Sequence, residues 1–162
     1  MHRLLIALGL TLCLAACGRG EEAKANMAAA TAFMSANGKA PGVKTLPSGV
    51  QYRVIASGPA DGPRPGPSDE VKVNYEGKLL SGTVFDSSFA RGEPANFPLA
   101  GLIPAWTEAL QRMRPGDEWI LYVPPAMGYG EKASGPIPPN SVLIFRIQLL
   151  GVLQHPGGTQ LG

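Results

Sequence analysis

Apolar and polar residues alternate along several short stretches of this chain, which is the pattern of a strand with one buried face. The clearest stretch is 71–80, where Val71, Val73 and Tyr75 fall on one face and charged or amide residues fall on the other. The same reasoning predicts further strands over 50–56, 83–85, 97–99, 119–123 and 142–150. The last of these is rich in Val, Leu, Ile and Phe, as expected for the centre of a sheet.

One helix interrupts this strand pattern. Ile103, Trp106 and Leu110 recur at steps of three and four residues, which places them on one face of a helix over 103–112. Pro104 lies in the predicted first turn, where its missing N–H costs no hydrogen bond. Several short strands around one short helix indicate an α+β fold.

Length and composition fit a single folded unit with appendages. The chain has 162 residues, of which 21 are Gly and 16 are Pro, so we expect many turns and short strands rather than long helices. A core of this size needs no metal or disulfide to hold it together. The predicted domain spans 47–151, contains polar loops at 58–68 and 87–96, and is followed by a frayed tail at 152–162.

Residues 1–16 have the pattern of a secretory signal peptide, with one Arg followed by an apolar run. This run is too short to cross a bilayer, because a spanning helix needs about 20 apolar residues. Leu-Ala-Ala-Cys at 14–17 also resembles the bacterial lipobox, which would make Cys17 the lipidated first residue of the mature chain. The alternative is an ordinary signal peptide with a chance cysteine. Gly18, rather than Asp, follows Cys17, which favours the outer membrane.

Residues 17–46 are predicted to form a tether and a short helical arm. An alanine-rich stretch without Pro or Gly predicts a helix over 22–36, because alanine has the highest helix propensity. Asn37 and Gly38 are a suitable stop for it.

Charge and histidine content exclude several classes of function. The net charge is +2 and no basic block occurs, which argues against a nucleic-acid partner. The two histidines, His2 and His155, lie near the chain ends, so neither a Ser-His-Asp triad nor a histidine metal site is expected. No cofactor is expected either.

Four motifs, together with Phe97, resemble the FKBP family of peptidyl-prolyl cis–trans isomerases over about residues 47–151. They are V-K-V-N-Y-E-G-K-L-L-S-G-T-V-F-D-S-S at 71–88, I-P-A-W at 103–106, P-P-A-M-G-Y-G at 124–130 and I-P-P-N-S-V-L-I-F at 137–145. The segment 42–54 is similar to the joint between arm and domain in the macrophage-infectivity-potentiator-like branch. The resemblance implies an antiparallel half-barrel sheet wrapped around one short helix.

The resemblance also implies a set of site residues. Trp106 is the expected floor of a proline pocket, Tyr129 the donor to the substrate carbonyl, and Asp86 the carboxylate that accepts a bond from Tyr75 and faces that carbonyl. The expected walls and rim are Phe85, Phe97, Leu102, Ile103, Ile137 and Phe145. Ile103 also offers the backbone N–H of a helix start. Taken alone, Trp106 and the aromatic residues on strands also fit core positions, whereas Asp86 and Tyr129 also fit turns.

The implied activity is rotation about X–Pro bonds in exported proteins, by a lipoprotein of the bacterial cell envelope that is tethered to the membrane through Cys17. Expected partners are proline-containing peptides, unfolded exported proteins and FK-type macrocyclic inhibitors. Two alternatives remain. One is a non-catalytic, peptide-holding chaperone that uses the same pocket, and the other is a purely structural envelope lipoprotein.

Overall fold

A computed structural model describes residues 13–153 of the chain. Residues 1–12 of the predicted signal peptide and the tail from 154 on lie outside the described residues. The strands in chain order are β1 (Val43–Thr45), β2 (Gln51–Ala56), β3 (Glu70–Leu79), β4 (Val84–Ser87), β5 (Ala95–Pro98), β6 (Glu118–Val123) and β7 (Leu143–Leu153). The α-helices are α1 (Cys13–Asn37), α2 (Ser88–Arg91) and α3 (Pro104–Leu110), and two 3₁₀ turns are η1 (Leu99–Gly101) and η2 (Pro125–Met127).

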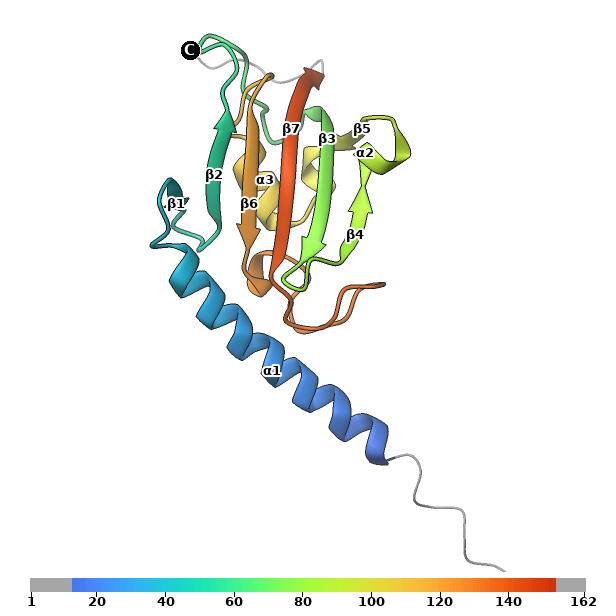
Figure 1. Cartoon of the computed structure of the whole chain (residues 1–162). Coiled ribbons are helices and arrows are strands. Elements are labelled where there is room, and N and C mark those ends of the chain that lie inside the picture. The colour runs from blue at the N-terminus through green and yellow to red at the C-terminus, as the bar shows by residue number, and fades with distance from the viewer. Residues whose placement is uncertain (1–12, 154–162) are drawn as a thin grey trace, which may run out of the picture.

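The strands form one antiparallel sheet in the order β1-β2-β6-β7-β3-β4, and β5 also pairs with β3. The long central pair, β3 and β7, sets Tyr75 opposite Ile147 and Gly77 opposite Phe145. The helix α3 packs against one face of this curved sheet (Figure 1). The predicted α+β fold, a half-barrel sheet around one short helix, is confirmed.

The core lies between α3 and the facing side of the sheet. Ala105, Trp106, Ala109 and Leu110 form the buried side of α3. The sheet meets them with alternate residues of its strands, as the period of two requires. On β3 these are Val71, Val73, Tyr75 and Gly77, while Lys72 between them is exposed. Both predicted faces, of strand 71–80 and of helix 103–112, are therefore confirmed.

Two short elements differ from the sequence expectation. The stretch 87–96 is not only a loop: it contains the single-turn helix α2 and the start of β5. Ser87 caps α2 by accepting a bond from the N–H of Ala90, and Gly92 closes it at φ 76°. One turn is too short to show a helical period, which is why the pattern missed it. Strand β1 was also missed, because three residues carry no readable alternation.

The arm helix α1 begins nine residues before the predicted start and includes Gly18 and Gly20. Each glycine costs a helix about 1 kcal/mol relative to alanine, which is why the sequence predicted a start after both of them. Where the arm meets the sheet, Phe33 packs on Tyr122 with ring centroids 6.0 Å apart. Among the described residues, no helix has the length and apolarity needed to cross a bilayer.

Candidate functional site

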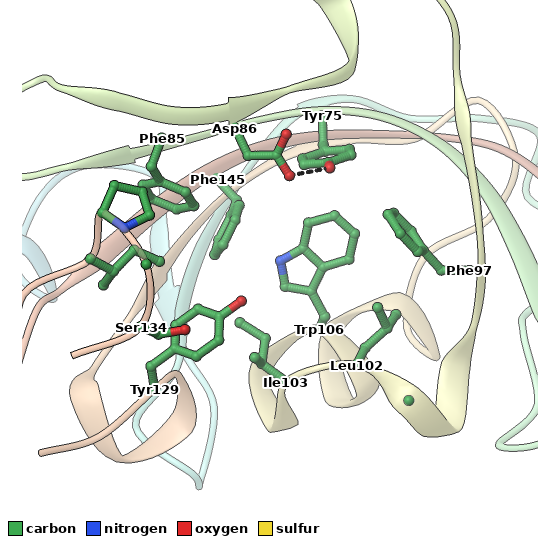
Figure 2. A pocket seen from close by; sticks show the side chains of 14 residues that line it. Tyr75, Phe85, Asp86, Phe97, Leu102, Ile103, Trp106, Tyr129, Ser134 and Phe145 are labelled. Carbon is green, nitrogen blue, oxygen red and sulfur yellow. Dashed lines mark hydrogen bonds between the residues drawn. The ribbon is translucent and has the colours of Figure 1, made fainter. Parts of the chain in front are cut away.

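A pocket of about 490 Å³ opens beside α3. Its residues come from β3, β4, β5, β7, the start of α3 and the segment 129–137 (Figure 2). These elements are distant in sequence, so the pocket exists only in the folded chain. Its lining is dominated by aromatic and aliphatic side chains, with few polar groups among them.

Aromatic rings stand edge-on around Trp106 and form the inner part of the pocket. The ring centroids of Tyr75 and Phe145 each lie 5.2 Å from that of Trp106, and Phe97 lies 6.0 Å away, all at interplanar angles of 84° to 86°. Phe85 extends the wall by packing at 5.7 Å on Phe145. Edge-to-face pairs are worth about 0.5–1.5 kcal/mol each beyond their burial, so this box is a stable and well-defined arrangement.

Trp106 is placed by the first turn of α3. Pro104 occupies the start of the helix, and Ile103 is its N-cap, which turns the chain so that the next residues face the sheet. Trp106 is 3% exposed, and its Nε1 has no hydrogen-bond partner within the described part of the chain. Figure 2 shows this nitrogen on the side of the pocket where Tyr129 and Phe145 lie. A buried donor without a partner is costly, so it is available to a ligand carbonyl.

A polar cluster lies at the rim, on the Tyr75 side of the box. The Tyr75 hydroxyl donates to the Asp86 carboxylate. Arg91 donates to the other oxygen of Asp86 at 2.5 Å and to the Tyr75 hydroxyl at 3.1 Å. The Arg91 guanidinium also lies 5.6 Å from the centre of the Tyr75 ring. The three side chains thus fix one another at the edge of an apolar pocket.

The sequence analysis identified Asp86 and Tyr75 but missed Arg91. The helix α2 explains its position, because one turn that starts at the Ser87 cap and ends before Gly92 brings Arg91 back over Asp86. The sequence held a clue in the Ser-Ser pair after Asp86, since serine is a preferred N-cap. Recognising that cap would have predicted the turn.

Hydrogen bonds within the cluster determine the protonation states of Asp86 and Tyr75. Burial alone raises the pKa of Asp86, but bonds from Tyr75 and Arg91 outweigh it and hold that pKa below its usual value. Burial and the bond to Asp86 raise the pKa of Tyr75 above its usual value. At neutral pH, Asp86 is therefore an ionised acceptor and Tyr75 a protonated donor.

The opposite side of the pocket offers further donors. Tyr129 is 44% exposed and its hydroxyl points into the pocket (Figure 2). Ile103 is the N-cap of α3, and within residues 13–153 its backbone N–H makes no hydrogen bond. Free N–H groups at a helix start are available to a ligand carbonyl. The pocket thus combines an apolar interior with hydrogen-bond donors at its edge.

The structure brings together every residue that the sequence analysis assigned to the pocket. These ten are Tyr75, Phe85, Asp86, Phe97, Leu102, Ile103, Trp106, Tyr129, Ile137 and Phe145. The sequence analysis did not assign Gly101, Ser134, Gly135 and Pro136, which also line it. The predicted lipidation residue Cys17 lies in α1, which contributes no residue to the lining of this pocket.

Two family models match the chain. Residues 62–150 match the model described as FKBP-type peptidyl-prolyl cis-trans isomerase, and residues 15–54 match the domain amino terminal to such isomerases. The first runs from before β3 to residue 150 in β7 and covers the whole pocket. The second covers the described part of the arm and continues into β2.

Curated relatives support the same assignment. The chain is 55% identical over 122 residues to the peptidyl-prolyl cis-trans isomerase Mip of Coxiella burnetii, which covers 75% of this chain and 52% of that protein. It is 48% identical over 133 residues to the outer membrane protein MIP of Legionella longbeachae, which covers 82% of this chain and 56% of that protein. This chain therefore spans little more than half the length of these two relatives.

Solved structures support the same family assignment. The crystal structure of FkpA from Escherichia coli superimposes with a TM-score of 0.83 at 40% identity and covers 88% of this chain and 66% of that one. The peptidyl-prolyl cis-trans isomerase from Pseudomonas syringae superimposes with a TM-score of 0.75 at 36% identity, covering 81% of this chain and 96% of that one.

Proposed function

Because this chain belongs to the family of FKBP-type peptidyl-prolyl cis-trans isomerases, we propose that its pocket binds X–Pro segments and accelerates rotation about the X–Pro bond. The proposed substrates are proline-containing segments of unfolded exported proteins. The aromatic box around Trp106 is the observation that carries the proposal, since it offers a proline ring an apolar site with hydrogen-bond donors beside it.

The chemistry needs no nucleophile and no bond cleavage. Rotation must overcome the loss of amide resonance, a barrier of about 18–20 kcal/mol, and takes about 10–100 s without a catalyst. A planar amide is more charge-separated than a twisted one, so an apolar pocket penalises the planar state more than the twisted state. Each 1.4 kcal/mol of such differential binding gives about a tenfold acceleration.

The pocket residues have distinct proposed roles. Trp106 lies under the proline ring, and Phe97, Phe85 and Phe145 enclose the ring from the sides, with Leu102 and Ile137 at the rim. Tyr129 and the Ile103 N–H donate to substrate carbonyl oxygens. Asp86, oriented by Tyr75 and Arg91, faces the carbonyl carbon of the twisting amide. All of these groups line or adjoin one pocket, which supports the assignment.

Isomerisation of a short X–Pro peptide tests this function directly. We expect the full chain to accelerate it, and we expect Trp106→Ala, Asp86→Ala and Tyr129→Phe each to lower kcat/KM by at least tenfold. Tyr52→Phe is a matched control, because Tyr52 stacks on Trp119 at 4.3 Å and does not line the pocket. Rates in the three pocket variants equal to those of the wild type would overturn the proposed mechanism.

Aggregation and binding assays on the same variants separate the isomerase from a peptide-holding chaperone. A holding module would suppress aggregation of an unfolded client even in variants that have lost turnover. A purely structural lipoprotein would bind neither proline peptides nor FK-type macrocycles. We expect both kinds of ligand to bind the wild type and to bind Trp106→Ala more weakly.

For location, we propose the bacterial cell envelope, with a lipid anchor at Cys17 and the domain in the periplasm at the outer membrane. The name of the Legionella relative, an outer membrane protein, supports the envelope. The division into signal peptide (1–16), tether and arm (17–46), isomerase domain (47–151) and tail (152–162) belongs to the same proposal. One acyl chain anchors only marginally, so stable attachment requires multiple acylation.

Substitution of the cysteine tests the anchor. Cys17→Ser is expected to release the protein from the membrane fraction, whereas Cys13→Ser, a matched control within the proposed signal peptide, leaves it there. Retention of Cys17→Ser in the membrane fraction would exclude this anchor.

A further inference from the structure

Two reciprocal hydrogen bonds join the arm helix α1 to the loop before β7. Asn26, on the arm, donates through Nδ2 to the backbone oxygen of Pro139 at 2.8 Å. Asn140, on the loop, donates through Nδ2 to the backbone oxygen of Ala23 at 3.0 Å. The arm and this loop lie at the same end of the sheet (Figure 1). The arm is therefore hydrogen-bonded to the loop at two successive residues, Pro139 and Asn140.

Asn140 has an unusual backbone conformation at this contact between arm and loop. Among the described residues it is the single non-glycine residue with a positive φ, 54°, and it is only 7% exposed. Its backbone N–H donates to the oxygen of Gly130 at 2.8 Å. Asn140 therefore contacts the arm through its side chain, and through its backbone it contacts Gly130, the residue after Tyr129. Asparagine is among the few residues that adopt this conformation readily.

The backbone bond from Asn140 to Gly130 brings the contact with the arm next to the pocket. Gly130 follows Tyr129, which lines the pocket and is the proposed donor to the substrate carbonyl. A second bond holds the same turn, because the Gly130 N–H donates to Pro125 at 2.9 Å. Tyr129 itself is 44% exposed, so neighbouring side chains constrain its ring less than they would a buried residue. Its position depends on the backbone on either side of it.

We propose that the arm helix positions Tyr129, with Asn26 and Asn140 as positioning residues that act through Pro139 and Gly130. The arm is thus part of the active site's support as well as a tether. A misplacement of about 1 Å in a donor can cost up to a hundredfold in rate, so a loosened loop has a measurable consequence. The inference rests on the proposed isomerase function for its effect on rate, but the effect on the loop itself does not depend on activity.

Full-chain variants test the proposal. Asn26→Ala removes the bond to Pro139. Asn140→Gly removes the bond to Ala23 while keeping the positive φ that glycine adopts without strain. Asn37→Ala is the matched control, because Asn37 lies on the same helix and donates to Gln51 at 2.8 Å, outside the joint with the loop. We expect Asn26→Ala and Asn140→Gly to lower kcat/KM on an X–Pro peptide by three- to tenfold, and Asn37→Ala to stay within twofold of the wild type.

Amide hydrogen exchange provides a readout that does not require catalysis. Peptides from 128–141 are expected to exchange faster in Asn26→Ala and Asn140→Gly than in the wild type or Asn37→Ala. Unchanged exchange in both variants would overturn the inference. If the wild type itself does not accelerate isomerisation, the proposed function fails, and exchange alone decides whether the arm fixes the loop.

A double-mutant cycle shows whether Asn26 acts through Tyr129. The loss of rate caused by Asn26→Ala should shrink to less than twofold in a Tyr129→Phe background, because the donor that it positions is already gone. An undiminished loss in that background would mean that Asn26 supports the domain generally, and would overturn the positioning role.

Discussion

Gly77 lies behind the pocket wall, and adding one methyl group there should damage both the fold and the site. A Cβ on Gly77 would lie 2.6 Å from two ring carbons of Phe85 and 2.7 Å from one of Phe145. Gly77 pairs with Phe145 across the central strands, and the rings of Phe85 and Phe145 fill the space that a side chain at residue 77 would need. A glycine within a strand often marks such a close approach.

The size of the effect follows from these distances. Carbon atoms pack at about 3.5–4.0 Å, so each ring must retreat by about 1 Å. Overpacking of this kind costs about 1–3 kcal/mol, and the reduced freedom of the unfolded chain returns about 0.4–1 kcal/mol. The net loss for Gly77→Ala is therefore up to about 2.6 kcal/mol. At about 2–4 °C per kcal/mol for a chain of this size, this lowers Tm by up to about 10 °C.

Gly151→Ala is the matched control. Gly151 lies in β7, and the nearest atom to its added Cβ is the Cβ of Lys72 at 4.0 Å, an ordinary contact. Its stability should stay within about 1 kcal/mol of the wild type or rise. Urea unfolding gives the free energy of unfolding of each variant, and isomerisation of an X–Pro peptide gives its kcat/KM. We expect Gly77→Ala, but not Gly151→Ala, to lose at least tenfold in kcat/KM. Equal stability and equal rate in the two variants would refute the inference that Gly77 makes room for the rings of the pocket wall.

Three further predictions concern polar groups. The pKa of Asp86 is lowered in the folded state, so its charge stabilises the fold at neutral pH. This contribution is lost as the pH falls from the ordinary aspartate range, about 3.9, through the lower folded-state value. The difference in the free energy of unfolding between the wild type and Asp86→Asn should therefore shrink on acidification, and a difference that grows below about pH 4 would contradict the sign. Arg91→Ala should raise the pKa of Asp86 toward its usual value, as carbon NMR of the carboxyl group would measure, and an unchanged titration would show that Tyr75 alone sets it. Asp117→Ala should cost about 1–3 kcal/mol in urea unfolding, because the buried Asp117 carboxylate accepts from the N–H groups of Gly58 and Arg114 at 2.7 and 2.9 Å. The exposed Asp61→Ala should change stability by less than about 0.5 kcal/mol, and an equal loss in the two variants would contradict the role of these bonds.

The aromatic box was predictable because its members occupy inward-facing positions of regular elements. Tyr75 lies on the buried face of an alternating strand, and Trp106 on the buried face of a helix with a clear period. Their periods show which side of each element is buried. The resemblance to a known family then implied that these separate faces meet in one pocket. Periodicity alone could not have shown this, because it carries no information on which elements are neighbours.

The parts that were missed are those that depend on irregular backbone. Arg91 reaches Asp86 only because a single capped turn brings it back, and Asn140 reaches the arm only from a left-handed conformation. Neither geometry leaves a period in the sequence. The apolar interior of the pocket is thus built on regular elements, which resist change. The groups that we propose orient its polar edge, Arg91 and Asn140, lie at the end of a one-turn helix and in a loop, and loops vary more in sequence than the elements they connect. It follows that substrate preference can change through these supports while the box around Trp106 stays intact, so a variant at Arg91 or Asn140 should alter the rate on different X–Pro peptides unequally.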